Sequence, residues 1–354
     1  MKNNTIPIGG EPFYSPAMLF TKAKNNFKTE LKISYPDKYL TFTYGGYYSL
    51  RIILEHLNFN KNEIVLLPSY LCPTILIPFK EYGINYQFYK IKEDLSIHTI
   101  DLQNKITNDV KAVFFINYFG FKQPNHVLGK LLELKRKGIL LIQDCVQDFY
   151  VKQDDVIGNY AFMSFRKFFP LEGSLIISDN KIEGIKISGL NRKYFYNKLK
   201  GRFLRYCNYK YGCKDKYFLN AFEVANNSYH ITKNLKFTKY DEYVFNRMDI
   251  EKDKKIRKGN FALLIQNIKD ISVINTLSDD VVPMAFPIRI KDRNSVHNEL
   301  RKQSIFCPVH WHLSEEIDTV QFKESWELSN SILSIPINSV SDYTSIINIL
   351  KKIL

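Results

Sequence analysis

Short, continuously apolar runs alternate with segments of helical periodicity between residues 43 and 178, and this alternation constrains the fold more than any other feature. Runs such as 113–116 and 139–142 carry apolar residues at every position rather than at every second one. Strands with this pattern are covered on both faces, as in a parallel sheet flanked by helices. The sequence therefore predicts an α/β fold with a mostly parallel sheet.

The predicted elements follow one another closely in this part of the chain. Strands are expected at 63–67, 85–89, 111–116, 138–142, 160–165 and 175–178. Helices are expected at 47–57, 74–82 and 126–137. Before residue 40, four prolines (Pro7, Pro12, Pro16 and Pro36) exclude long regular structure.

The pattern changes towards the C-terminus. There we expect helices at 252–268 and 295–302 and strands at 283–290 and 304–309, and the segments 326–331, 332–336 and 343–354 finish the chain. A chain of 354 residues is long enough for one large and one smaller domain. We therefore expect a large α/β domain at 1–245, which includes an N-terminal arm and a basic, aromatic helical segment at 190–240, and a small α+β domain at 246–354.

The chain is strongly basic, with a formal net charge of +14, which favours anionic partners. Nine basic residues and one acidic residue lie between 192 and 216, interleaved with aromatic residues. Such interleaving occurs in surface helices whose lysine stems cover tyrosine rings, and also in interfacial helices and nucleic-acid sites. We expect a surface helix, with an anionic substrate or a membrane surface as the alternative. We expect no nucleic-acid partner, because no recognised binding motif accompanies the segment.

The apolar runs, cysteines and histidines indicate the cellular compartment and whether a metal site is expected. No apolar run reaches membrane-spanning length, and the first residues lack the apolar centre of a signal peptide, so a cytoplasmic location is expected. The five cysteines are scattered and have no zinc-site spacing, which favours reduced thiols. His310 and His312 form a close pair, but no further ligand is apparent nearby, so no metal site is expected.

Polar residues come directly after four of the predicted strands, at 68–72, 117–120, 144–147 and 164–167. Ligands of such sheets collect beyond the carboxyl ends of the strands, so these segments should converge on one cleft. Gly45 and Gly46 precede the first predicted helix and suit a phosphate cradle, because glycine allows the backbone to approach an anion at a helix N-terminus. A purely structural turn is the alternative for this pair.

Asp144 and Lys167 are the candidate chemical groups of this cleft. Pyridoxal phosphate (PLP) needs a carboxylate that keeps its pyridine nitrogen protonated and a lysine amine that forms a Schiff base. Lys167 follows an apolar strand, where burial would lower its pKa, and no other lysine lies between Lys152 and Lys181. The alternatives are a helix N-cap role for Asp144 over 145–149 and an ordinary surface role for Lys167.

Six segments, in order, resemble motifs of the DegT/StrS family of sugar aminotransferases, which are fold type I PLP enzymes. They are V-L-L-P-S-Y at 65–70, N-Y-F-G at 117–120, Q-D-C-V-Q at 143–147, G-N-Y-A-F-M-S-F at 158–165, Q-S-I-F-C-P-V-H at 303–310 and I-L-S-I-P at 332–336. The resemblance runs from residue 7 nearly to the C-terminus. It implies the fold type I large domain, PLP as the cofactor and a homodimer.

The resemblance also assigns roles around the pyridine ring. It implies that Lys167 is the Schiff-base lysine and later a proton carrier, that Asp144 pairs with the pyridine nitrogen, and that Gln147 lies near the ring oxygen. Cys72 stands where the family has its ring-stacking aromatic residue, and Tyr70 is the alternative cover. Lys167 arrives two residues sooner than in the family pattern Ser-Phe-x-x-x-Lys.

For the phosphate group, the resemblance implies Ser164 together with the backbone of Gly46, Tyr47 and Tyr48. The family has Thr-Ala where this chain has Tyr47-Tyr48.

The activity that the resemblance implies is transfer of an amino group to a keto-sugar. We expect a nucleotide-linked sugar, an amino-acid donor such as glutamate, and a role in surface polysaccharide or amino-sugar biosynthesis. Sugar 3-dehydratases of the family replace the lysine with histidine, so Lys167 argues against that subclass. The alternatives are a PLP enzyme for a small keto or amino compound and a non-catalytic binding or regulatory protein that keeps the fold.

Overall fold

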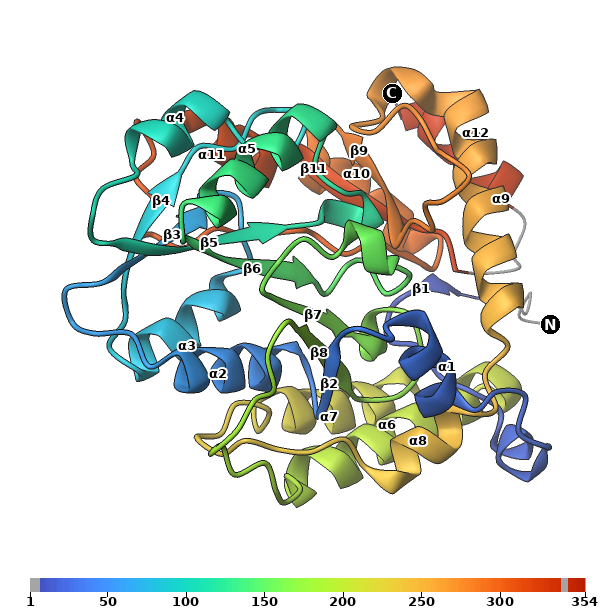
Figure 1. The fold of residues 1–354 in the computed structure, drawn as a ribbon. Helices are drawn as coiled ribbons and strands as arrows, with labels where there is room; N and C mark the ends of the chain where they lie inside the picture. Colours follow the sequence, from blue (N-terminus) through green and yellow to red (C-terminus); the bar gives the residue numbers. More distant parts are fainter. Residues whose placement is uncertain (1–6, 339–342, 354) are drawn as a thin grey trace.

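A seven-stranded sheet with the order β2-β8-β7-β6-β5-β3-β4 forms the centre of the computed structural model, which describes residues 7–338 and 343–353 (Figure 1). Its strands are β2 (Tyr39–Thr43), β3 (Ile64–Pro68), β4 (Asn85–Tyr89), β5 (Val110–Ile116), β6 (Leu140–Cys145), β7 (Tyr160–Ser164) and β8 (Ser174–Ser178). Strands β3 to β7 pair in parallel, and β8 runs antiparallel to both of its neighbours. The predicted mostly parallel sheet is therefore confirmed, and every strand predicted between residues 63 and 178 is present.

Helices cover the sheet, so the apolar residues of its inner strands are buried. Every residue of β7 and β8 is buried, as are all but the first residue of β6. Helix α2 packs against β7 and β8, and α5 packs against β6. The helices of this part are α1 (Phe27–Ser34), α2 (Gly46–Leu57), α3 (Leu76–Glu81), α4 (Thr99–Asn104) and α5 (Asn125–Arg136). Short 3-10 turns are η1 (Pro16–Phe20), η2 (Pro73–Ile75), η3 (Tyr118–Gly120), η4 (Gln153–Asp155), η5 (Phe165–Lys167) and η6 (Lys269–Ile271).

The C-terminal elements surround an apolar cluster of their own, to which Phe261, Phe286 and Leu333 belong. They are α9 (Ile250–Ile268), β9 (Ala285–Arg289), α10 (Arg293–Lys302), β10 (Ile305–Phe306), α11 (Lys323–Ser331), β11 (Ile332–Pro336) and α12 (Tyr343–Ile353). Strands β9 and β11 pair antiparallel, whereas β1 (Ile8–Gly9) pairs in parallel with β10. The N-terminal arm therefore lies against the C-terminal elements.

The strand predicted at 304–309 is wrong in its length. Strand β10 has two residues, and the chain leaves the extended pairing at Cys307. Pro308 follows, and proline has no backbone N–H with which to continue a ladder.

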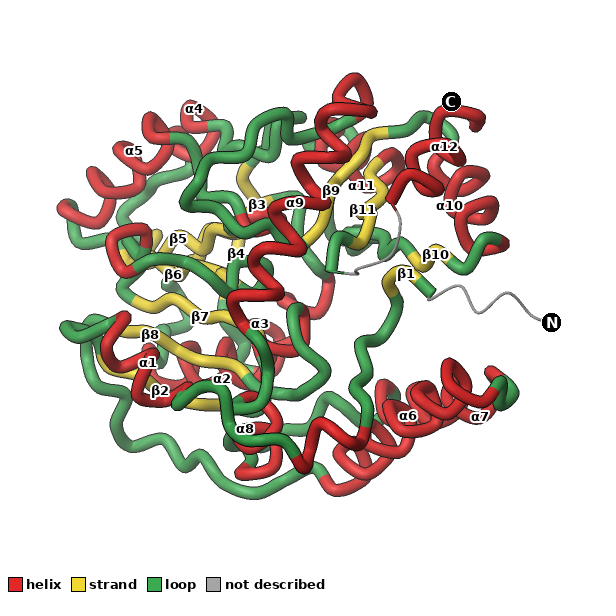
Figure 2. The backbone as a smooth tube through the Cα atoms, turned by 90° about the vertical axis from the view of Figure 1, so that its right-hand side faces the viewer, coloured by secondary structure: helices red, strands yellow, loops and turns green. Residues whose placement is uncertain are grey.

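Helices α6 (Arg192–Tyr211), α7 (Asp215–Asn226) and α8 (Lys239–Phe245) lie together beside the β2 edge of the sheet (Figures 1 and 2). The predicted basic helix is present as α6, but it is only partly a surface helix. Lys198, Arg202 and Arg205 are buried. The opposite side of the helix is open to solvent, where Tyr196 and Phe203 are exposed.

One buried carboxylate, one half-buried carboxylate and a backbone carbonyl explain why α6 can bury its cations. Lys198 Nζ lies 2.7 Å from Glu11 Oε1, and Arg202 Nη2 lies 2.6 Å from Glu172 Oε1. Arg205 donates a hydrogen bond of 2.8 Å to the Gly9 carbonyl. These pairs fix the N-terminal arm against α6.

We expect Glu172→Ala to destabilise the protein strongly, because it leaves the buried Arg202 guanidinium without its closest carboxylate. Loss of one partner of a buried ion pair costs roughly 3–5 kcal/mol. Denaturant unfolding of the variant should show this loss. The control is Glu183→Ala, which removes an ion pair between exposed side chains and should leave the unfolding midpoint unchanged. Equal midpoints for the two variants would contradict the prediction.

Candidate functional site

The residues that follow β5 and β6 are held together by hydrogen bonds. The Asn117 N–H donates to the Asp144 carbonyl at 3.0 Å, and the Phe119 N–H donates to Gln147 Oε1 at 2.7 Å. Because these strands are parallel neighbours, both segments leave the sheet at the same edge. The predicted convergence of 117–120 with 144–147 is therefore present.

Asp144 is buried, with 5 % of its surface exposed. Its Oδ1 accepts a hydrogen bond of 2.8 Å from the Val146 N–H, which closes a turn. The N-cap alternative is wrong, because this turn does not continue into a helix over residues 145–149. Burial raises the pKa of the Asp144 carboxyl to about 7, although the Val146 N–H and the nearby charge of Lys167 act in the opposite direction. Within 7–338 and 343–353, its Oδ2 has no hydrogen-bond partner.

Lys167 ends η5, the single 3-10 turn that directly follows β7. Burial and the neighbouring charge of Arg166 lower the pKa of its amine, and Cys72, Glu11 and Asp144 partly oppose this. In the part of the chain that the structure describes, Lys167 Nζ makes neither a hydrogen bond nor an ion pair. An amine with a lowered pKa and no bonded partner is available as a nucleophile.

Two buried polar atoms beside this pair lack hydrogen-bond partners among the described residues. They are the Gln147 side-chain nitrogen and the Ser164 hydroxyl oxygen. The Gln147 amide is oriented by the bond from Phe119 to its oxygen, which leaves its nitrogen as a free donor. A buried donor without an acceptor costs about 1–3 kcal/mol, so both atoms point to a ligand that supplies acceptors.

The first turn of α2 offers further donors. The first hydrogen bond inside the helix runs from the Ser49 N–H to the Gly45 carbonyl, so the N–H groups of Gly46, Tyr47 and Tyr48 have no partner within the helix. Both tyrosine side chains are engaged elsewhere: Tyr47 donates to Glu81 at 2.7 Å and Tyr48 donates to the Tyr229 carbonyl. Neither tyrosine hydroxyl therefore bonds to these backbone N–H groups.

An aromatic wall lies on the side of the C-terminal elements. Tyr70 donates to the His310 carbonyl and packs against Tyr118 and Trp311, with ring centroids 5.7 and 5.4 Å away. Tyr70 is fully buried behind these rings. Cys72 is partly exposed, with its Sγ 3.1 Å from Thr74 Oγ1. Sequence reasoning did not identify Tyr118 or Trp311 as part of this wall.

His310 lies beside this wall, and the charge of Lys167 affects the pKa of its imidazole. Burial and the charge of Lys167 lower the pKa of its imidazole to about 3, so the ring is neutral. Its Nδ1 lies 2.7 Å from Ser334 Oγ, which fixes the ring plane. In the sequence, His310 was singled out by its close pairing with His312 and by the segment at 303–310.

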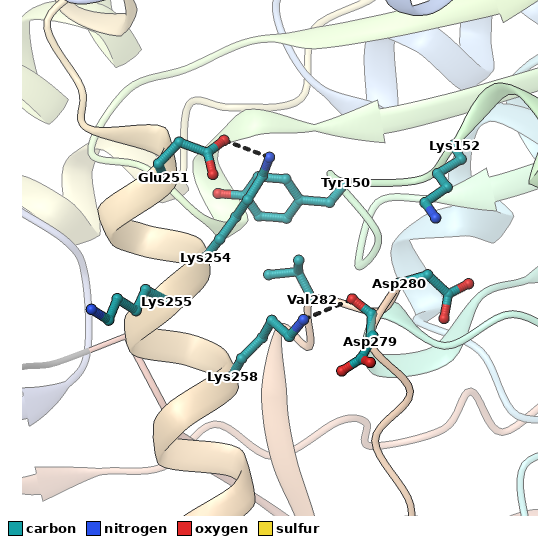
Figure 3. Close-up of a pocket in the computed structure, with 9 residues that line it drawn as sticks. All are labelled: Tyr150, Lys152, Glu251, Lys254, Lys255, Lys258, Asp279, Asp280 and Val282. Carbon is teal, nitrogen blue, oxygen red and sulfur yellow. Dashed lines mark hydrogen bonds and ion pairs between the residues drawn. The ribbon is translucent and has the colours of Figure 1, made fainter.

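A hollow of about 460 Å³ lies elsewhere, between α9 and the loop around residue 280 (Figure 3). Two of its lysines have partners: Lys254 pairs with Glu251 at 2.7 Å, and Lys258 donates to the Asp279 carbonyl. Neither Asp144 nor Lys167 lines it. The candidate site is therefore the edge of the sheet rather than this hollow.

Two general features of the described ranges bear on function. No group of three or more His, Cys, Asp and Glu side chains there could hold a metal ion. Nor do these ranges contain a helix that is long and apolar enough to cross a membrane.

By sequence, neither a family model nor a curated protein matches this chain. Solved structures match it over nearly its whole length. The sugar aminotransferase CalS13 from Micromonospora echinospora has a TM-score of 0.69 at 12% identity, covering 98% of this chain and 99% of CalS13. A DegT DnrJ EryC1 StrS aminotransferase from Brucella abortus has a TM-score of 0.67 at 14% identity, covering 95% of this chain and 94% of the other.

NtdA from Bacillus subtilis, solved with bound PMP, has a TM-score of 0.68 at 14% identity and covers 96% of this chain and 78% of its own. The chain has the fold of the sugar aminotransferases. The fold that the sequence motifs imply is thereby confirmed, at identities low enough to mark a divergent chain.

The raised pKa of Asp144 predicts how Asp144→Asn changes stability with pH. The folded-state pKa of about 7 lies above the reference value of 3.8. Its stabilising contribution is therefore complete below pH 4 and is lost as the pH rises through about 7, by at most about 4 kcal/mol. Asparagine carries no charge, so the cofactor-free variant should melt above wild type at pH 8, and the difference should shrink at pH 4.

Thermal unfolding at the two pH values measures this difference. Glu183→Gln is the control, because its side chain is exposed and should not alter the pH dependence. A melting temperature of Asp144→Asn equal to or below that of wild type at pH 8 would show that the carboxylate is not held in a penalising environment.

Proposed function

We propose that this protein is a PLP-dependent aminotransferase that acts on a keto-sugar. The observation that carries the proposal is the meeting of Asp144 and Lys167 at one edge of the sheet, each with an unpartnered functional atom among the described residues. A buried Gln147 amide nitrogen and a buried Ser164 hydroxyl beside them also lack partners in those ranges. This set of donors, carboxylate and amine fits the polar groups of PLP.

Each residue would hold a different part of the cofactor. Asp144 Oδ2 would accept from the pyridine nitrogen, and the Gln147 amide would donate to the ring oxygen. Ser164 and the backbone N–H groups of Gly46, Tyr47 and Tyr48 would bind the phosphate. Cys72 or the aromatic wall would cover the ring. When bound, PLP supplies an electron sink for the carbon that loses its proton.

The protein's own groups would control protons at this site. A lowered pKa keeps more of the Lys167 amine unprotonated at neutral pH, so Nζ can accept a proton from one carbon and return it to another. Asp144 becomes easier to ionise once a positive pyridine nitrogen faces it. His310 stays neutral across this range and so adds no charge that would compete with Lys167.

The substrate is proposed from charge and from the structural neighbours. The neighbours include sugar aminotransferases, and a net charge of +14 suits a substrate with phosphates, such as a nucleotide-linked keto-sugar. We propose glutamate as the amino donor and a role in surface polysaccharide or amino-sugar biosynthesis. A homodimer, which the sequence resemblance implies, is part of the same proposal. So are a cytoplasmic location and a domain division at residue 245, which rest on the composition and the pattern of the sequence.

A small keto or amino compound is the second candidate substrate. The partly exposed Cys72 in place of a stacking aromatic residue favours it, because this position borders the proposed ring site.

We expect Lys167→Ala to abolish covalent attachment of PLP. Wild type mixed with PLP should turn yellow, and borohydride should fix the cofactor to the peptide that contains Lys167, as seen by mass spectrometry. Lys181→Ala is the control, because that amine is exposed and pairs with Glu183. Borohydride labelling of the Lys167→Ala variant would contradict the assignment.

The reaction itself is tested by turnover. Wild type loaded with PLP should convert glutamate to 2-oxoglutarate when it is given nucleotide-linked keto-sugars, and Lys167→Ala should not. Turnover only with small keto acids would favour the second substrate class. Attachment of PLP without turnover across both panels would contradict the aminotransferase proposal.

A further inference from the structure

A tyrosine from outside the predicted motifs reaches the start of α2. Tyr229 follows α7 in the chain and is 5 % exposed. Its hydroxyl occupies the space next to Gly45, where an added Cβ would clash with it. Among the described residues this hydroxyl has no hydrogen-bond partner. An unpaired phenol is therefore aimed at a helix terminus whose first N–H groups are also unpaired within the helix.

Neighbouring rings hold Tyr229 in this direction. Its ring centroid lies 4.9 Å from that of Tyr194 and 5.4 Å from that of Tyr48. Tyr48 also donates its hydroxyl proton to the Tyr229 carbonyl. The phenol is thus fixed from both the ring and the backbone, so it is preorganised rather than free to turn to solvent.

Arg166 supplies a cation at the same place. Its guanidinium carbon lies 4.7 Å from the centroid of the Tyr229 ring. In the described ranges it forms neither a hydrogen bond nor an ion pair. The two carboxylates in its electrostatic surroundings form their ion pairs with other cations, Glu172 through Oε1 with Arg202 and Glu11 with Lys198. Arg166 is therefore a positive charge without a contacting anion.

We propose that Arg166 and Tyr229 complete a site for a phosphate monoester dianion at the start of α2. The inference rests on the proposed function, in which that anion is the phosphate of PLP. The donors would be the guanidinium fork, the phenol, the Ser164 hydroxyl and the first N–H groups of α2. A dianion at a helix N-terminus gains from the helix dipole and from the charge-assisted bonds that an arginine makes.

This arrangement differs from a closed tyrosine cluster without a ligand. In a closed cluster, Tyr229→Phe would remove a buried hydroxyl that lacks a partner, stabilise the protein and leave anion affinity unchanged. In an anion site, the same substitution removes a donor and weakens the binding of phosphate-bearing ligands.

The test compares PLP with pyridoxal, which has the same ring and aldehyde but no phosphate. We expect Arg166→Gln to weaken PLP binding by roughly 10- to 100-fold, the loss typical of a hydrogen bond to a charged group. Pyridoxal binding should weaken much less, because pyridoxal has no phosphate and is affected only through the higher pKa that Lys167 has without the Arg166 charge. Tyr229→Phe should weaken PLP binding by about fivefold or more and spare pyridoxal. Arg166→Lys, which keeps the charge but loses the fork, should fall between wild type and Arg166→Gln.

A second arginine–tyrosine stack provides matched controls. The Arg247 guanidinium carbon lies 3.4 Å from the centroid of the Tyr243 ring, and Tyr243 donates to the Leu19 carbonyl. Arg247→Gln and Tyr243→Phe should bind PLP and pyridoxal as wild type does. Thermal unfolding of each variant checks that it is folded under the assay conditions.

Calorimetric titration with inorganic phosphate separates this inference from the proposed function. If borohydride fixes PLP to Lys167 in wild type but Arg166→Gln and Tyr229→Phe keep wild-type affinity for PLP, the inference is overturned and the function stands. If wild type does not attach PLP, the proposed function fails, and the phosphate titration still decides. Phosphate binding that is lost in Arg166→Gln and kept in Arg247→Gln would support the site, whereas equal binding in both would overturn it.

Discussion

Parallel pairing of β6 with β7 places Asp144 opposite Phe162 and Cys145 opposite Met163, so both strands end at the same edge of the sheet. The chain then reverses into β8 through residues 165–173, and the Phe165 N–H donates to the Gly173 carbonyl at 2.9 Å where this connection closes. Gly173 has a φ of +139°, and an added Cβ would lie 2.6 Å from the rings of Phe165 and Phe237. Lys167 ends the 3-10 turn that opens this connection, so it stays within electrostatic reach of Asp144.

Burial is the common cause of the shifted ionisation at this edge. It raises the pKa of Asp144 and lowers the pKa values of Lys167 and His310, because each charged form loses contact with water. The unpaired donors of Gln147 and Ser164 add to the cost in the free protein. The apolar core that extends over the sheet offsets these unfavourable free-energy contributions. Their concentration at one place is typical of a ligand site.

The fold was predictable because continuous apolar strands and their order along the chain are local signals. Strand β2 was not predicted, since most of its residues are only partly buried and it follows a proline-containing segment. The buried cations of α6 were also missed, because their partners Glu11 and Glu172 are distant in sequence. Tyr229 left no signal for the same reason. The roles assigned to Cys72 and to the other site residues, and the domain division at residue 245, stay predictions.

The ion pairs of α6 leave one cation at the candidate site, Arg166, without a contacting carboxylate among the described residues, which the sequence motifs alone do not show. Glu11 and Glu172 satisfy Lys198 and Arg202, and no contacting carboxylate in the described ranges is left for Arg166. Its charge therefore acts on Lys167 and lowers the pKa of that amine. An anion bound at Arg166 would offset this effect, so occupancy of the phosphate site and the proton affinity of Lys167 are linked. The ion pairs of α6 thus influence the ionisation of Lys167, because they leave Arg166 without a contacting carboxylate in the part of the chain that the structure describes. The segment after α7 contributes the Tyr229 side chain to the same region.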